Sequence, residues 1–171
     1  MNKRYIIADT HFNHANIIKY ESRPFSDVSE MNDRMIKSWN GVVGKDDKIF
    51  FLGDFGFGKK EQLTELCNQL NGKKYMILGN HDRRFRPSVW REIGFEEASK
   101  YPIIIGGFVI LSHEPVYLND HMPYVNLHGH IHSKTMNSNQ YFNVSVECCD
   151  YIPLNLDKLI NDLTMLNMKG K

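Results

Sequence analysis

The sequence lacks the features that mark several large classes of protein. No apolar run approaches the roughly 20 residues of a membrane-spanning helix, and the run behind the basic N-terminal residues, Tyr5 to Ala8, is too short for a signal-peptide core. The three cysteines, Cys67 and the adjacent pair Cys148 and Cys149, make a poor disulfide framework. The net charge of +1 gives no global attraction to nucleic acid or an anionic membrane. These absences predict a soluble, cytoplasmic protein with no membrane partner.

The rest of the composition is that of an ordinary globular protein. Of 171 residues, 42% are hydrophobic and 24% charged, a length and balance that suffice for one hydrophobic core. The sequence shows no internal repeat, low-complexity tract or linker-like change in composition. It therefore predicts a single domain over residues 1–171.

Short apolar runs alternate with helical patterns in the first half of the chain. Continuous apolar runs at residues 5–8, 49–52 and 75–78 are typical of strands buried on both faces. Two helical stripes lie between them: Met31, Met35, Ile36 and Trp39, and then Leu63, Leu66, Cys67 and Leu70. This order predicts right-handed crossovers and a largely parallel sheet.

The second half predicts a different arrangement. Apolar residues 103–105 and 108–111 flank Gly106 and Gly107, which indicates a tight hairpin, and further strands are expected at 125–127 and 141–146. A final helix from about Asn155 has one apolar stripe: Leu156, Leu159, Ile160, Leu163 and Leu166. We therefore predict an α/β fold in which two mixed sheets form a sandwich with helical outer layers.

Polar segments follow five of the predicted strands. They are Asp9-Thr10-His11, Gly53-Asp54, Gly79-Asn80-His81-Asp82, Ser112-His113 and His128-Gly129-His130-Ile131-His132. Any one of them alone is no more than a common turn sequence. Because ligand sites of open α/β sheets lie at the carboxyl ends of the strands, the ordered set of five indicates a single site.

The side chains of these segments favour metal chemistry. Carboxylate, neutral imidazole and amide oxygen are suitable ligands for divalent transition metals, and the two oxygens of Asp54 suit it to bridge two ions. Two such ions carry more charge than Asp9 and Asp54 neutralise, so the centre should attract phosphate and acidify a bridging water. His81 is placed to protonate a leaving group, and Asp82 is a candidate to orient it.

The ordered set of motifs, from Tyr5 to Val144, resembles that of the calcineurin-like metallophosphoesterase superfamily. The resemblance implies a four-layer α/β/β/α sandwich with two divalent metal ions at the strand ends, manganese being expected and iron, zinc, cobalt or nickel alternatives. It also implies attack by a metal-bound hydroxide without a phosphoenzyme. Asp9, His11 and His132 would hold one ion, Asn80, His113 and His130 the other, with Asp54 as the bridge and His81 as the catalytic histidine that binds no metal.

Within the superfamily the chain looks most like small bacterial, archaeal and phage phosphoesterases. Its residues 9–18 and 143–147 carry that likeness, together with Tyr151-x-Pro153. The protein Ser/Thr phosphatases follow their Gly-Asp with an Asp-Arg-Gly element, whereas here Asp54 is followed by Phe55-Gly56-Phe57-Gly58. The arginine that would grip phosphate is missing, which argues against a protein phosphatase.

The segment after the catalytic motif allows two interpretations. Its arginines and aromatics could grip phosphate and stack on bases, or they could form a solvated loop and a short helix from Pro87 with Trp90 in the core. The residues concerned are Arg83, Arg84, Phe85, Arg86, Trp90 and Arg91. We select Arg83 and Arg84 as candidate substrate contacts, and also His14 and Asn16, which follow the first ligands. Of the other residues near these motifs, His128 is expected to be buried with a hydrogen bond to the backbone, and His121 is expected to be exposed. Phe55 and Phe57 either line the pocket or cap the core.

The function predicted is hydrolysis of a small, nucleotide-like phosphodiester or phosphomonoester. One alternative is a nuclease, which predicts a continuous basic track from Arg83 to Arg91 and is disfavoured by the low net charge. Another is a scaffold that has lost catalysis, which the presence of His81 and of all seven ligands argues against. The expected partner is thus a small phosphoester, with nucleic acid less favoured, and the sequence leaves the oligomeric state open.

Overall fold

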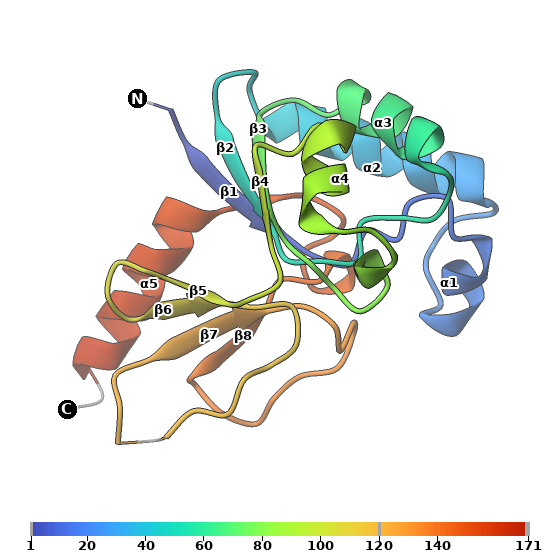
Figure 1. The fold of residues 1–171 in the computed structure, drawn as a ribbon. Coiled ribbons are helices and arrows are strands. Elements are labelled where there is room, and N and C mark those ends of the chain that lie inside the picture. Colours follow the sequence, from blue (N-terminus) through green and yellow to red (C-terminus); the bar gives the residue numbers. More distant parts are fainter. Residues whose placement is uncertain (1, 120, 170–171) are drawn as a thin grey trace.

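Two β-sheets lie face to face in the computed structural model, which describes residues 2–119 and 121–169, with side chains as far as residue 165 (Figure 1). The first sheet has the strand order β4-β3-β2-β1-β9. Its strands are β1 (Arg4–Ile7), β2 (Lys48–Phe51), β3 (Lys73–Ile77), β4 (Glu97–Ser99) and β9 (Leu154–Asn155). The first four are parallel, as predicted, and only β9 runs antiparallel to its neighbour β1. The carboxyl ends of β1, β2 and β3 therefore meet at one edge.

Helices α1 (Ala15–Tyr20), α2 (Val28–Val42), α3 (Lys60–Gln69) and α4 (Pro87–Ile93) belong to the crossovers of this sheet. The apolar stripes predicted for α2 and α3 pack against the sheet in one cluster, in which Met31, Trp39 and Leu63 are fully buried. Burial of each such side chain contributes about 1.5–3 kcal/mol. Asp27 caps the start of α2 by accepting a hydrogen bond from the backbone N–H of Glu30.

The second sheet has the order β5-β6-β7-β8 and is also mixed. Its strands are β5 (Ile103–Ile105), β6 (Val109–Leu111), β7 (Val125–His128) and β8 (Tyr141–Asn143). The predicted hairpin joins β5 to β6, and Gly106 and Gly107 adopt the positive φ angles, 59° and 80°, that its turn requires. The β6–β7 and β7–β8 pairs are parallel.

The last predicted strand was too long. β8 ends at Asn143, not at residue 146, because the side chain of Asn143 accepts a hydrogen bond from the backbone N–H of Ser145. The chain then leaves the second sheet, and Ser145 pairs with Ala8 at the end of β1 before a 3₁₀ turn over Val146–Cys148. The segment after β8 thus reaches the carboxyl end of the first sheet.

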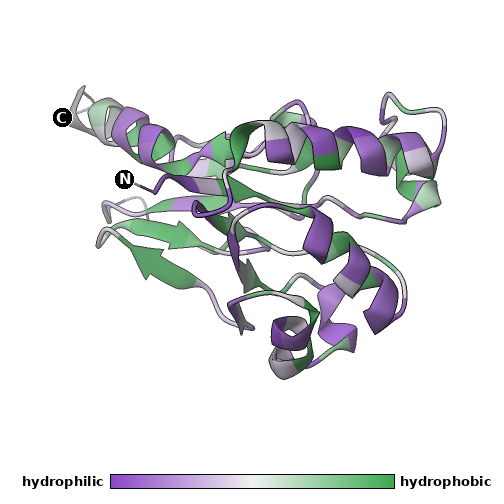
Figure 2. Cartoon of the chain, turned by 90° about the horizontal axis from the view of Figure 1, so that it is seen from above, coloured by the Kyte–Doolittle hydropathy of each residue, from purple (hydrophilic) through white to green (hydrophobic). Residues whose placement is uncertain are grey.

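Apolar residues from both sheets form a second cluster between them. Ile6 and Leu52 come from the first sheet, and Val109 and Leu127 from the second. Helix α5 (Leu156–Lys169) adds Leu156 and Leu163, with Leu159 and Ile160 partly buried beside them; the side chain of Leu166 lies outside the described residues. The strands accordingly appear hydrophobic and the helices striped in Figure 2. Two mixed sheets with flanking helices confirm the predicted fold class.

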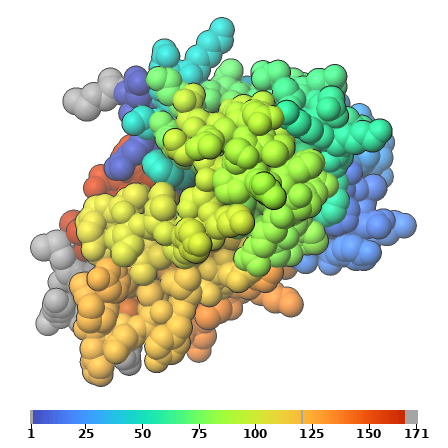
Figure 3. All heavy atoms as spheres, viewed as in Figure 1, coloured from blue at the N-terminus to red at the C-terminus, as the bar shows by residue number. Residues whose placement is uncertain are grey.

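The space-filling view of one face shows how the crossovers enclose the sheets. Residues of α3 and α4 cover its upper part, and the β5–β6 hairpin and the connections on either side of β7 form its lower part (Figure 3). Across residues 2–119 and 121–169, no helix has the length and apolar character that crossing a bilayer requires.

Candidate metal centre

The five polar segments come together at the strand ends. Backbone N–H groups of Asp9 and His11 donate to the carbonyl oxygens of Gly53 and Asp54, each at 3.0 Å. Across the two sheets, the backbone N–H of His130 donates to Asp9 Oδ2 at 2.8 Å. Loops far apart in sequence are thereby held side by side.

Asp9, His11 and His132 form what we call the first half-site. One ligand atom from each lies within 4.8 Å of the others. Asp9 Oδ1 and His11 Nε2 are buried and have no hydrogen-bond partner. Because buried polar atoms in proteins are nearly always paired, two unpartnered atoms in one cluster fit a bound cation.

The second half-site consists of Asp54, Asn80, His113 and His130. Ligand atoms of Asp54, His113 and His130 again lie within 4.8 Å of one another. Asn80 Oδ1 is 3.0 Å from His113 Nε2 and 3.1 Å from His130 Nδ1. The Nδ1 of His113 lies 2.8 Å from the carbonyl oxygen of Leu52, which leaves Nε2 as the ligand atom facing the group.

Asp54 lies between the two half-sites. Its Oδ2 is 3.5 Å from His11 Nε2 and 3.5 Å from His113 Nε2. The structure thus brings all seven predicted ligands into two adjacent groups with one carboxylate between them. Carboxylate, imidazole and amide oxygen form a donor set suited to divalent transition metals.

Five of these seven residues have left-handed backbone conformations. The φ angles are 57° for Asp9, 48° for His11, 59° for Asp54, 70° for His130 and 51° for His132. For residues other than glycine this region costs of order 1–3 kcal/mol each and persists only where surrounding contacts enforce it. Such strain is concentrated at functional sites in proteins, which supports a functional role for the cluster.

Two glycines permit the close approach of the ligand loops. A Cβ added to Gly129 would lie 2.3 Å from Asp9 Oδ2, and one added to Gly79 would lie 2.1 Å from Asp54 Oδ1. No larger residue fits at either position without moving a carboxylate. These are the glycines of the predicted Gly-His-x-His and Gly-Asn-His-Asp motifs.

Burial disfavours charge at the first half-site. It raises the pKa of Asp9 to about 8, and together with the neighbouring His132 it lowers the pKa of His11 to about 2. Without a cation both groups are therefore held in their neutral forms near neutral pH. A divalent ion reverses this preference for Asp9, because it stabilises the carboxylate that burial disfavours.

His81 lies exposed beside the two half-sites. Its backbone N–H donates to Asp54 Oδ1 at 3.0 Å, and its ring centroid is 5.4 Å from that of His11 and 5.3 Å from that of Phe57. The position agrees with that expected of an acid on the leaving-group side. Its catalytic role stays a prediction.

The prediction that Asp82 orients His81 is wrong. Asp82 is buried, and its carboxylate accepts hydrogen bonds from the backbone N–H groups of Asp54, Phe55 and Gly79 at 2.6–3.1 Å. Burial and the charge of Asp54 raise its pKa to about 7. Asp82 therefore stabilises the backbone of the loop that carries Asp54. Among the hydrogen bonds of the described residues, none joins its side chain to His81.

The four predicted substrate contacts differ in their positions. His14 lies against the centre, with its Nδ1 3.4 Å from His11 Nδ1 and its ring 4.2 Å from that of Phe57. Arg84 donates to the carbonyl oxygen of Gly56 and lies over the Phe57 ring, whereas Arg83 pairs with Glu114 at 3.1 Å. Asn16 lies exposed in α1, and its substrate role stays a prediction.

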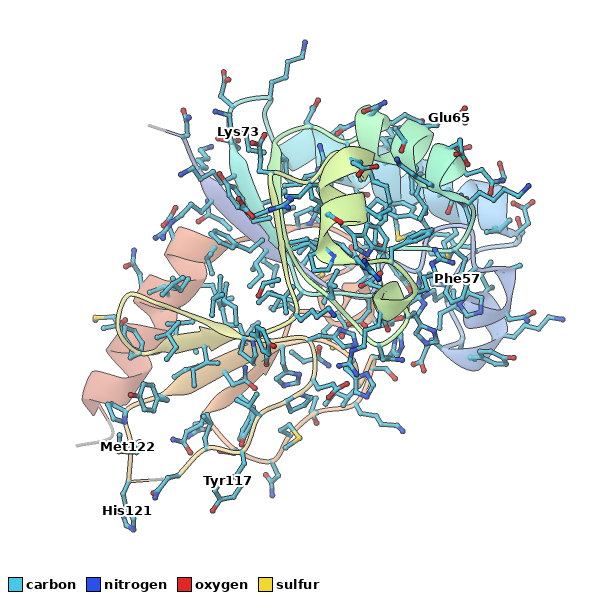
Figure 4. All side chains as sticks on the ribbon, in the orientation of Figure 1. Phe57, Glu65, Lys73, Tyr117, His121 and Met122 are labelled. Carbon is cyan, nitrogen blue, oxygen red and sulfur yellow. The ribbon has the colours of Figure 1, made fainter. Side chains whose placement is uncertain are left out.

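The remaining aromatic and histidine residues lie in the core, beside the centre or on the surface. Trp90 and Phe55 are fully buried, which confirms the core alternative for Trp90, and Phe57 lies near α1 beside the centre (Figure 4). His128 is buried with its Nδ1 2.9 Å from the carbonyl oxygen of Gly129, as expected. His121 is exposed on the β6–β7 connection with Tyr117 and Met122, far from Phe57 in the same view.

Three residues that support the centre were not predicted as site residues. Ser145 donates its hydroxyl to Asp9 Oδ2 at 2.8 Å. Glu147 Oε1 lies 3.1 Å from His132 Nδ1, and Arg23 binds Glu147 and the backbone of the first loop. The alternation of Ser145 and Glu147 after a strand was the one available signal, because nothing in the sequence marks Arg23 as buried.

The fold is thus a sandwich of two mixed sheets, with two candidate metal-ligand groups at the strand ends. The family model for calcineurin-like phosphoesterases matches residues 3–169, and the chain belongs to that family. The resemblance inferred from the motifs is thereby confirmed. Members of the family are generally metal-dependent phosphoesterases.

Relatives extend over nearly the whole chain. An uncharacterized protein of Methanocaldococcus jannaschii is 39% identical, with 100% of this chain and 94% of the relative covered. The gene 66 protein of Mycobacterium phage D29 is 28% identical, with 95% and 98% covered. The crystal structure of a protein of unknown function from Aquifex aeolicus has a TM-score of 0.75 at 25% identity, with 95% of this chain and 100% of that chain covered. They support the fold and family and name no substrate.

Proposed function

We propose that the chain hydrolyses a small, nucleotide-like phosphoester with two divalent metal ions, manganese being the expected ion. The observation that carries this proposal is the position of Asp54 Oδ2, 3.5 Å from a histidine of each half-site. One carboxylate between two ligand groups is the arrangement expected of a bridged pair of ions.

The residues divide the work of hydrolysis between them. When bound, the two ions would supply positive charge that binds the phosphoryl oxygens and lowers the pKa of an attacking water. Asp9, His11 and His132 would hold one ion, Asn80, His113 and His130 the other, and Asp54 both. His81 would donate a proton to the leaving oxygen as a general acid.

The surroundings of His81 support a substrate with a flat group. Phe57 lies between His14, His81 and the Arg84 guanidinium, and it is half-buried at the edge of the centre. Aromatic rings and guanidinium groups stack on nucleobases. The basic track required by a nuclease is weakened, because Arg83 pairs with Glu114 and Arg91 with Glu97. A nucleotide therefore suits the site better than a polymer.

Paired chromogenic substrates test the proposal. Metal-stripped protein is assayed with a phosphate monoester and a bis-ester, with Mn²⁺ added back, and a mononucleotide diester is compared with a short oligonucleotide. We expect Mn²⁺-dependent turnover and preference for the mononucleotide. Faster cleavage of the oligonucleotide would favour the nuclease alternative. Absence of turnover with all substrates, when two ions are bound, would favour the scaffold.

Substitution of His81 separates catalysis from metal binding. We expect His81→Ala to lower turnover by about 10²–10⁴-fold while two ions remain bound, because general acids contribute about that much and His81 is no ligand. The loss should be smallest for an ester with a good leaving group, which needs no proton. Loss of a metal ion from the variant would show that His81 is a ligand and would refute its proposed role. His121→Ala, an exposed histidine on the β6–β7 connection, is the matched control.

A further inference from the structure

Arg23 lies buried in the loop that follows α1. Its side chain has no exposed surface, yet it carries a full positive charge. It donates to the carbonyl oxygens of Asp9 and Thr10, at 2.7 and 2.8 Å, and through Nε and Nη2 to Glu147 Oε1, at 2.9 and 2.6 Å. A buried charge is costly unless it is paired and hydrogen-bonded, and the oxygen atoms that pair this one belong to the first loop and to Glu147.

Glu147 connects this arginine to the first half-site. Its Oε1 accepts from Arg23 and lies 3.1 Å from Nδ1 of His132. Because a carboxylate only accepts, Nδ1 of His132 carries a proton, and in the neutral ring that binds a metal ion the lone pair is then on Nε2. Because Nδ1 is hydrogen-bonded to Glu147, Nε2 is the nitrogen available to bind the metal ion of the first half-site, together with Asp9 and His11.

The same guanidinium fixes the other two ligands of that half-site through the backbone. Asp9 and His11 have left-handed φ angles of 57° and 48°, and the two carbonyl oxygens that Arg23 binds belong to Asp9 and to Thr10 between them. Arg23 therefore supports the strained loop directly and His132 through Glu147. The second half-site is held by other groups, the carbonyl oxygen of Leu52 and the carboxylate of Asp82.

We propose that Arg23 and Glu147 form a positioning pair that prepares the first half-site for its metal ion and leaves the second half-site unaffected. The proposal rests on the two-ion centre proposed above. The pair touches no reacting atom, so neither residue is catalytic. Its consequence is that the two ions differ in their dependence on a single buried ion pair.

A third metal ion is the competing explanation of the same cluster. Ligand atoms of Glu21, His132 and Glu147 lie within 4.8 Å of one another, and Glu147 Oε2 is buried with no hydrogen-bond partner. Arg23, however, already places its positive charge 2.6 Å from Glu147 Oε1, and a cation beside it would be repelled. The guanidinium thus already supplies the positive charge that a third ion would bring to Glu147.

Site-resolved Mn²⁺ binding tests the pair. Metal-free full-length protein is titrated with Mn²⁺ against a competing fluorescent chelator, and folding of each variant is checked by its melting temperature. The wild type is expected to bind two ions. Glu147→Gln should weaken one of them by about 10–100-fold and the other by less than about twofold. Asp157→Asn, which removes the partner of Arg4 on α5, is the matched control and should change neither.

A double variant covers the case in which Glu147→Gln does not fold. Arg23→Leu with Glu147→Leu removes both charges together, which is often tolerated where removal of one is not. It should show the same selective loss of one ion. ¹⁵N NMR of the histidine rings gives a readout independent of metal: His132 should be protonated at Nδ1 in the wild type and lose this preference in the double variant.

The other outcomes contradict either the positioning role of Arg23 and Glu147 or the proposed function, and the two failures can be told apart. Equal weakening of both ions, or of neither, contradicts the positioning role while the two-ion centre stands. A third ion lost in Glu21→Gln would establish the competing site. If the wild type binds no pair of ions, the proposed function fails, and the His132 protonation measurement then decides the role of Glu147 alone.

Discussion

The two half-sites have nearly the same types of candidate ligand, but different groups hold those ligands in place. In the first half-site the ligands are held by side chains: Ser145 and Arg23 hold the Asp9 loop, and Glu147 holds His132. In the second, the carbonyl oxygen of Leu52 holds His113, the backbone N–H of His81 donates to the Asp54 carboxylate, and the backbone N–H of Asp54 donates to the carboxylate of Asp82, which belongs to the same Gly-Asn-His-Asp motif as the ligand Asn80. Support by side chains comes from residues distant in sequence, so we expect the first half-site to be the more sensitive to substitutions outside the motifs.

Removal of the bridge should abolish the difference between the half-sites. We expect Asp54→Ala to weaken both ions and to lower phosphoester hydrolysis by about 10³-fold or more, since two coordinated ions supply several kcal/mol of transition-state stabilisation. Metal stoichiometry and turnover measure this. Asp46→Ala, an exposed aspartate in the turn before β2, should behave as the wild type. Retention of one tightly bound ion would show that Asp54 belongs to a single half-site.

Asp82→Asn should weaken the second half-site as Glu147→Gln weakens the first. The amide replaces one acceptor oxygen by a donor that faces the backbone N–H groups of Asp54 and Gly79. We expect a loss of about 1–3 kcal/mol in the free energy of unfolding, measured by denaturant titration, together with weaker binding at the second half-site. Asp47→Asn is the matched control, because Asp47 also accepts from backbone N–H groups, those of Lys3 and Gly44, in an exposed turn. Weakening of the first ion instead would contradict the separation of supports.

Gly129→Ala tests how closely the loops of the first half-site must approach. The new Cβ would meet Asp9 Oδ2 at 2.3 Å and Ala8 Cβ at 2.6 Å, so the variant should lose about 1–3 kcal/mol of stability and bind the first ion less tightly. Gly41→Ala is the comparison, since a Cβ there meets nothing within 4 Å in helix α2 and should stabilise the protein by about 0.5–1 kcal/mol. Unchanged metal binding in Gly129→Ala would show that Asp9 has room to move.

The pH dependence of stability should report the first half-site in the metal-free protein. Its Asp9 has a folded-state pKa raised to about 8 by burial, against about 3.9 when unfolded, so the folded protein binds that proton more tightly. The stability this confers is lost as pH rises through the folded pKa. His132, whose pKa is raised by Glu147 and Asp9 despite burial, acts in the same direction.

We therefore expect the melting temperature of metal-free protein to fall from about pH 7 to about pH 8.5, with a free-energy change on the order of 1 kcal/mol per pH unit. In this range His113 contributes little, because burial lowers its pKa and it is neutral in both states. Asp82, whose pKa is raised to about 7 by burial and by Asp54, acts in the same direction in the lower part of this range. Asp9→Asn should therefore reduce the decline, and Asp9→Asn combined with Asp82→Asn should reduce it further. An unchanged decline in Asp9→Asn would assign it to groups other than Asp9.

Much of the fold and of the centre could be predicted from local patterns. Residues such as Ile6 and Leu52 lie in apolar runs, and the spacing of Met31, Met35 and Trp39 has the helical period, so strands and helices were found near their observed bounds. The seven candidate ligands could be selected because each lies in a segment that follows a strand. A parallel sheet brings such positions to one edge whatever the details of packing.

What the sequence did not reveal depends on contacts across the fold. Asp82 lies next to His81 in the chain, but its carboxylate turns inward to the backbone of residues 54, 55 and 79. The end of β8 is set by Ser145 pairing with Ala8 of the other sheet. A single arginine in a loop gives no periodic signal, so burial of Arg23 follows only from the approach of Glu147, 124 residues further along the chain.

This separation bears on the order in which the protein matures. Asp9, Arg23 and strands β1 to β4 are synthesised early, whereas Glu147 leaves the ribosome after every predicted ligand. Until it arrives, the guanidinium has no counter-charge and is better hydrated than buried, so we expect the first loop to stay open on the nascent chain. Metal loading of the first half-site would then be among the last events of folding, which protects the growing chain from capturing an ion in an unfinished centre.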